Sequence, residues 1–116
     1  MAVDKTNFTP DILEAYRANA AIPGALTAMI NYYRASVRSP DFARYARGTV
    51  APITTPTLMI WGEADTALGV ELTDHYEGLV ENMTLKRLPN VSHWVQQEAP
   101  DKVNAILSEW LVPNNA

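Results

Sequence analysis

The sequence predicts an α/β fold with two parallel strands that form an incomplete sheet. Residues 57–61 are an unbroken apolar run between Pro56 and Gly62, which is typical of a strand buried on both faces of a parallel sheet. A second strand is expected at 83–88, and a helical segment at 70–80 connects the two. Because two strands do not make a sheet that is stable by itself in water, the sheet is expected to be incomplete.

Two helices are expected before the strands. Thr9–Asp11 combine a hydroxyl at the N-cap, a proline at the first helical position and an acid near the positive end of the helix dipole. This start predicts a helix that ends at about Asn19. A second helix is expected from residue 23 or 24 to about Val37, where apolar residues recur at steps of three and four. Ser39-Pro40 ends it, because the residue before proline avoids the α conformation.

The remaining segments are less regular in the sequence. Residues 1–8 are expected to be an unattached leader, residues 41–56 to be irregular, and residues 112–116 to be a polar tail. A final helix is expected to begin at Pro100. Its apolar face is formed by Val103, Ile106, Leu107 and Trp110.

Composition excludes several classes of function. The chain has 116 residues, enough for one domain at most, and a net charge of -4 gives no reason to expect nucleic acid or an anionic membrane as a partner. It lacks cysteine, and its two histidines lie in unlike contexts, which argues against disulfides and metal sites. No apolar run approaches the roughly 20 residues of a membrane span, and the N-terminus lacks the apolar stretch of a secretory signal. A cytoplasmic protein that binds no metal is therefore expected.

Asp65 and His93 follow the two predicted strands at their carboxyl ends. Ligands of open α/β sheets bind at that edge, and 28 positions between the two residues leave room for one connection and one strand. An acid that binds one imidazole nitrogen fixes the tautomer and leaves the other nitrogen free to act as a base. Taken singly, Asp65 is as well explained as a turn or N-cap residue, and His93 as a surface or packing histidine beside Trp94. The pair in this order and at this spacing favours catalysis.

Two segments resemble the late part of α/β-hydrolases. Residues 57–65, TLMIWGEAD, resemble the strand and acid loop, and residues 91–100, VSHWVQQEAP, resemble the histidine loop and the start of the last helix. The pattern His-Trp-x-x-x-Glu-x-Pro is particularly similar to that of epoxide hydrolases and their dehalogenase relatives. Residues 31–34, Asn-Tyr-Tyr-Arg, resemble the Asn-Trp-Tyr-Arg stretch of the epoxide-hydrolase cap, whose tyrosine binds the epoxide oxygen. The resemblance gives that role to Tyr33.

Plain packing remains an alternative for both aromatic candidates. Tyr33 shares a predicted apolar stripe with Met29, Ile30 and Val37, so a core tyrosine with a satisfied hydroxyl would also fit. Trp94 follows the histidine and is a candidate for lining the substrate pocket, although it could serve only in packing.

The resemblance also implies how the chain is organised. Residues 1–40 would be the end of a helical cap, 41–56 a linker back to the core, 57–112 the C-terminal βαβα part of the hydrolase core and 113–116 a tail.

The nucleophile of this fold is expected to lie outside the chain. It occupies a tight turn with glycines two positions to either side, whereas no two of the five glycines, at 24, 48, 62, 69 and 78, are four positions apart. Neither histidine is followed by glycine, so the His-Gly type of oxyanion segment is missing too. We expect the chain by itself to be an inactive C-terminal piece that associates with itself or with the absent N-terminal part.

In the complete family mechanism, a carboxylate opens the epoxide and forms an ester, and Tyr33 stabilises the departing oxygen. His93, oriented by Asp65, activates the water that hydrolyses the ester to a diol. This chemistry needs a small-molecule substrate and no cofactor. Two alternatives stay open: a serine esterase or a haloalkane or haloacid dehalogenase of the same fold, and a non-catalytic oligomerising module.

Overall fold

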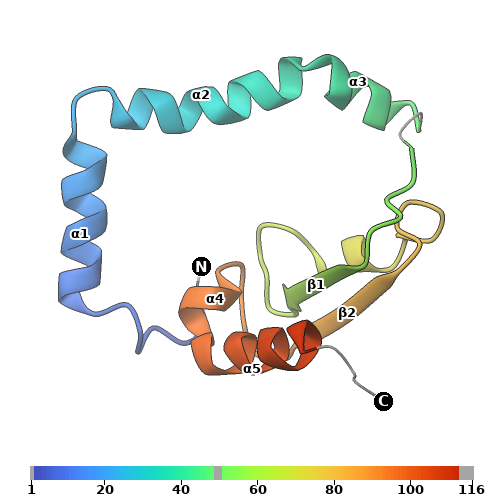
Figure 1. Cartoon of the computed structure of the whole chain (residues 1–116). Coiled ribbons are helices and arrows are strands. Elements are labelled where there is room, and N and C mark those ends of the chain that lie inside the picture. Colours follow the sequence, from blue (N-terminus) through green and yellow to red (C-terminus); the bar gives the residue numbers. More distant parts are fainter. Residues whose placement is uncertain (1, 49–50, 113–116) are drawn as a thin grey trace. The chain divides into compact units, whose positions relative to one another are not determined.

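A computed structural model describes residues 2–48 and 51–112 (Figure 1). The chain divides into two compact units. One combines Met1–Phe8 with Pro52–Ala116, and the other is Thr9–Ala51. Strands occur in the first unit, whereas the described part of the second is helical. The polar tail expected at 113–116 lies outside the described residues.

Three helices, α1 (Pro10–Ala21), α2 (Ala25–Arg38) and α3 (Pro40–Ala46), form the described part of the helical unit. The predicted start of α1 is confirmed, because the Thr9 side chain accepts a hydrogen bond from the amide of Ile12. The predicted start and end of α2 are also confirmed to within a residue or two, since Gly24 is its N-cap and Ser39 its C-cap. Gly24 has φ of 86°, a left-handed conformation that glycine adopts without strain.

Helix α3 corrects the prediction that residues 41–56 are irregular throughout. The Ser39 hydroxyl oxygen accepts the amide of Phe42 at 3.0 Å, Pro40 opens the helix and Asp41 lies in its first turn. These residues repeat the hydroxyl-proline-acid pattern that starts α1. Ser39 therefore ends one helix and begins the next.

The two predicted strands are confirmed as β1 (Thr57–Gly62) and β2 (Met83–Leu88). They pair in parallel, in a register that runs from Thr57 opposite Met83 to Gly62 opposite Leu88. Residues 57–61 are partly exposed and only Gly62 is buried, so β1 lacks the cover on both faces that its apolar run is typical of, as expected for an incomplete sheet. In the described residues β1 pairs with β2 alone, so its other edge has no strand beside it.

The helix expected at 70–80 is much shorter than predicted. Only Val70–Thr73 is helical, as a single 3-10 turn, η1. Further along, the backbone around Val80 pairs with Ile53: the Ile53 amide donates to Leu79 and its carbonyl accepts from Glu81. Residues 79–81 are therefore held in a bridge that a helix through Val80 would break.

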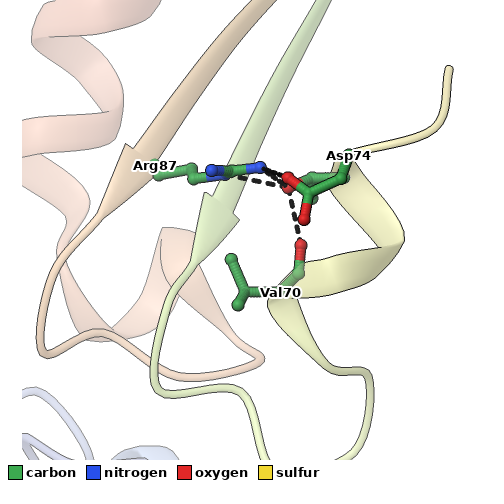
Figure 2. A network of polar contacts seen from close by, with 4 residues as sticks. Val70, Asp74 and Arg87 are labelled. Carbon is green, nitrogen blue, oxygen red and sulfur yellow. Dashed lines mark hydrogen bonds and ion pairs between the residues drawn. The ribbon is translucent and has the colours of Figure 1, made fainter. Parts of the chain in front are cut away.

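Polar contacts fasten η1 to β2 (Figure 2). Arg87 of β2 donates from Nε to the Thr73 hydroxyl oxygen at 2.8 Å and forms an ion pair with Asp74. The Thr73 hydroxyl in turn donates to the carbonyl of Val70 at 2.7 Å. Because Thr73 is fully buried, these bonds satisfy a hydroxyl that would otherwise be costly to bury.

The last two helices of the described residues are α4 (Val95–Glu98) and α5 (Pro100–Leu111). Helix α4 was not predicted from the sequence, whereas α5 starts at the predicted proline. The small core joins the end of β2, the loop after it and α5. Its buried apolar residues are Leu88, Val91 and Val103, and Ile60, Val95, Ala99 and Ile106 pack against them.

Residues 2–8 are not the unattached leader that the sequence suggested. The amides of Val3 and Asp4 donate to the side chain of Glu98 at 2.9 and 3.1 Å, and the Asn7 side chain donates to the Glu98 carbonyl. The partner of Val3 is 95 positions away in sequence, so no local sequence pattern predicts the contact. Whether residues 1–40 otherwise act as the end of a cap stays a prediction.

None of the helices in the described residues is long and apolar enough to cross a membrane.

The chain leaves much apolar surface uncovered, and we predict that it self-associates at micromolar concentration. On α2 the predicted stripe is exposed at Leu26, Met29, Ile30, Tyr33 and Val37, and β1 offers an unpaired edge. Exposed apolar patches and free strand edges both favour association. Sedimentation velocity of the purified chain should show dimers or larger species. A compact, folded monomer at all concentrations would contradict this.

Candidate active site

Asp65 and His93 meet at one edge of the sheet, as the sequence predicts. Asp65 follows β1 and His93 follows β2, and the pairing of Gly62 with Leu88 brings the two strand ends side by side. His93 Nδ1 lies 2.8 Å from Asp65 Oδ2, which is a hydrogen-bond distance.

The second oxygen of Asp65 holds the carboxylate in place. Oδ1 accepts the amides of Ala67 at 2.8 Å and Leu68 at 3.0 Å. Asp65 is thus also the turn residue that the alternative interpretation proposed, and the turn aims its other oxygen at His93. The Asp65 side chain is 5% exposed, whereas that of His93 is 35% exposed, so the acid is covered and the imidazole is open to solvent.

Electrostatics favour an ionised Asp65. Burial raises the pKa of its carboxyl, but the hydrogen bond with His93 and those from the amides of Leu68 and Ala67 outweigh burial and leave the pKa below its ordinary value. An ionised carboxylate only accepts hydrogen bonds, so Nδ1 of His93 is the donor. In the neutral imidazole Nε2 then has a free lone pair, which is what a general base requires.

Backbone contacts hold the acid loop against the histidine loop. The amide of Glu63 donates to the Leu88 carbonyl at 3.0 Å, and the amide of Ala64 donates to the Val91 carbonyl at 2.9 Å. The two loops approach closely at Gly62, because a β-carbon there would overlap the carbonyl oxygens of Ser92 and Val91. The separation of Asp65 from His93 therefore depends on glycine at residue 62.

The aromatic candidates have different surroundings. Trp94 is half exposed and meets the His93 ring edge to face, with ring centroids 5.2 Å apart. Tyr33 lies on α2 in the helical unit, is 71% exposed and packs edge to face on Tyr32. Tyr33 is thus not a core residue of its own unit, and its approach to His93 stays a prediction, as does the role of Trp94 in a pocket.

Sequence reasoning missed two buried polar residues next to the pair, Ser92 and Glu98, which hydrogen-bond to each other at 2.6 Å. Glu98 is the glutamate of the pattern His-Trp-x-x-x-Glu-x-Pro, and this pattern could have pointed to it. Within residues 2–48 and 51–112, histidine, aspartate and glutamate form no group of three or more that could hold a metal ion.

Comparison with known proteins places this geometry in a family. No family model matches the chain. Human epoxide hydrolase 4 is 36% identical over 104 residues, which cover 89% of this chain and 27% of that protein. Epoxide hydrolase 1 of Caenorhabditis elegans is 34% identical over 110 residues, covering 90% and 25%. The chain is thus similar to epoxide hydrolases of the α/β-hydrolase superfamily.

Further similarities agree with this family. The AB hydrolase superfamily protein YfhM of Bacillus subtilis strain 168 is 35% identical over 104 residues, covering 90% of the epoxide-hydrolase-like chain and 35% of YfhM. The crystal structure of a variant epoxide hydrolase from Bacillus megaterium superposes with a TM-score of 0.75 at 28% identity, over 92% of the chain and 39% of that structure. Cfl2 from Burkholderia cenocepacia, at 18% identity and a TM-score of 0.78, shares the fold. The chain spans about a quarter to a third of the length of the relatives matched by sequence.

We predict that Gly62→Ala disrupts the pair in this epoxide-hydrolase-like chain. The added methyl group would push the histidine loop away from β1, with an overpacking cost of about 1–3 kcal/mol or more. NMR titration should show the pKa of Asp65 returning towards its ordinary value as the bond with His93 is lost. The control is Gly69→Ala, where the atoms nearest to the new β-carbon belong to the movable carboxylate of Glu71. An unchanged Asp65 titration in Gly62→Ala would contradict the prediction.

A second prediction concerns acid. Because folding lowers the pKa of Asp65, its stabilisation is present above the ordinary carboxyl pKa of about 3.9 and is lost as the pH falls through the lower folded value. Asp65→Asn should reduce the free energy of unfolding by about 1–3 kcal/mol at neutral pH. The difference between the two proteins should shrink below about pH 4. Urea unfolding of both proteins over this pH range measures the difference in the free energy of unfolding. A difference that does not change with pH would contradict the assignment of a lowered pKa to Asp65.

Proposed function

We propose that this chain supplies the acid and histidine of an epoxide hydrolase, which converts an epoxide to a diol through an ester intermediate. The observation that carries the proposal is the bond between Asp65 and His93, which leaves Nε2 of a partly exposed imidazole free to act as a base. The names of the relatives supply the substrate class, since human epoxide hydrolase 4 and the C. elegans enzyme match about nine-tenths of the chain.

In the proposed first step, a carboxylate oxygen attacks an epoxide carbon, an ester C–O bond forms and the epoxide C–O bond breaks. The departing oxygen takes up negative charge, and the hydroxyl of Tyr33 stabilises it with a hydrogen bond. The nucleophile comes from another segment, because this sequence has no glycine pair spaced for the required turn. The chain by itself should therefore turn over no epoxide.

In the second step, Nε2 of His93 takes a proton from water, and the resulting hydroxide attacks the ester carbonyl. The ester C–O bond breaks, and the oxygen that leaves takes the proton from His93. The carboxylic acid that remains loses its proton, and the alkoxide formed in the first step gains one, which regenerates the carboxylate and completes the diol. Asp65 stays ionised and stabilises the imidazolium that exists between the two proton transfers.

A chimera tests the proposal. The chain would replace the matching region of the Bacillus megaterium epoxide hydrolase, and hydrolysis of styrene oxide would be measured. In the chimera, His93→Gln should lower turnover by about 10²–10⁴-fold and should leave the enzyme heavier by the mass of one epoxide, because the ester forms but is not hydrolysed.

Mass spectrometry of the intact protein after mixing provides the readout, and the unsubstituted chimera is the control. Full turnover by His93→Gln, without an adduct, would overturn the role of His93.

The same chimera tests Tyr33. Tyr33→Phe should slow epoxide opening by roughly one to two orders of magnitude, as expected for the loss of one donor to a developing oxyanion. Tyr32→Phe is the matched control, since adjacent helical residues point about 100° apart. Equal rates for Tyr33→Phe and the unsubstituted chimera would show that Tyr33 takes no part in the reaction.

A further inference from the structure

Glu98 is a buried carboxylate for which the proposed chemistry has no use. It is the last residue of α4 and is only 4% exposed. Burial raises the pKa of its carboxyl, but hydrogen bonds from the Ser92 side chain and from the amides of Asp4, Ser92 and Val3 outweigh burial and lower the pKa. Among the described residues these donors are uncharged, so hydrogen bonds, and no ion pair with a described side chain, hold the ionised carboxylate. A buried charge held in this way calls for an explanation.

The two oxygens of Glu98 bind different parts of the unit. Oε2 accepts the Ser92 hydroxyl at 2.6 Å, and Oε1 accepts the amides of Val3 and Asp4 at 2.9 and 3.1 Å. The main-chain carbonyl of Glu98 also accepts from the Asn7 side chain at 3.4 Å. One side chain thus connects the N-terminal segment to the residue that precedes His93.

The bond between Ser92 and Glu98 closes a seven-residue segment that carries His93. Ser92 is completely buried, so its hydroxyl depends on Glu98. On its other side, the Ser92 carbonyl oxygen lies where a β-carbon of Gly62 would be. The backbone just before His93 is therefore held by Glu98 through the Ser92 hydroxyl, and its carbonyl lies close against the end of β1.

We infer that Glu98 is a positioning residue: through Ser92 it holds the backbone before His93, so that Nδ1 stays bonded to Asp65. The inference deepens the proposed function, because it concerns the same histidine, but the geometry it describes exists without substrate. The hydrogen bond between Glu98 and Ser92 positions His93. The charge of Glu98, without that hydrogen bond, would not.

The test is hydrogen exchange at Nδ1 of His93, measured by NMR on the ¹⁵N-labelled full chain. Ser92→Ala and Glu98→Asp both keep the charges of the unit but break or lengthen the link. Each should speed exchange of the Nδ1 proton by about tenfold, the effect of losing one hydrogen bond to a charged group. The double variant should exchange no faster than the faster single variant, because both changes remove the same link.

Matched controls lie on α5. Ser108→Ala and Glu109→Asp make the same chemical changes at exposed residues and should leave the exchange rate unchanged. Amide signals of β1 and β2, recorded on the same samples, separate local from general effects. An unchanged exchange rate in Ser92→Ala and Glu98→Asp would overturn the inference. So would additive effects in the double variant, or loss of the strand signals together with that of His93. Because no substrate is used, failure of the epoxide assay would leave this result standing.

Discussion

The parallel pairing of β1 with β2 determines where the candidate active site lies. Its last pair joins Gly62 to Leu88, so both strands end at one edge and release their loops side by side. The lack of a side chain at Gly62 lets the two loops touch, and backbone bonds from Glu63 and Ala64 then hold them together. The bond between Asp65 and His93 follows from this arrangement. Under the proposed function, the imidazole would be oriented before substrate binds, which lowers the cost of reaching the transition state.

The features that the sequence predicts correctly depend on local patterns. The apolar run at 57–61 indicates a strand because its composition and its boundaries agree. The Asp65–His93 contact could be predicted because parallel strands bring successive carboxyl ends to the same edge. Helix α3 could also have been predicted, since Ser39-Pro40-Asp41 repeats the start of α1. The sequence therefore contains the signal for α3, although the prediction did not use it.

The features that escaped prediction depend on contacts between distant residues. The helix expected at 70–80 stops after one turn because the backbone beside Val80 pairs with Ile53, and no spacing within that segment reveals this partner. In the sequence residues 2–8 resemble a leader, whereas in the structure the side chain of Glu98 accepts hydrogen bonds from the amides of Val3 and Asp4. Both contacts involve backbone groups: the carbonyl and amide of Ile53 in the first case and the amides of Val3 and Asp4 in the second. Backbone groups have no sequence signature. The Asn-Tyr-Tyr-Arg resemblance gives Tyr33 its proposed role, and the Tyr33→Phe chimera remains its test.

The tautomer of His93 tests the account most directly, because the proposed hydrolysis of the ester requires Nδ1 to carry the proton and Nε2 to be free. Long-range ¹H–¹⁵N correlation spectra of the neutral imidazole distinguish the two tautomers. The account predicts the Nδ1–H tautomer for the unsubstituted chain and its loss in Asp65→Asn, where a carboxylate no longer accepts the proton. A dominant Nε2–H tautomer in the unsubstituted chain would mean that Asp65 does not orient the base, and would contradict the account.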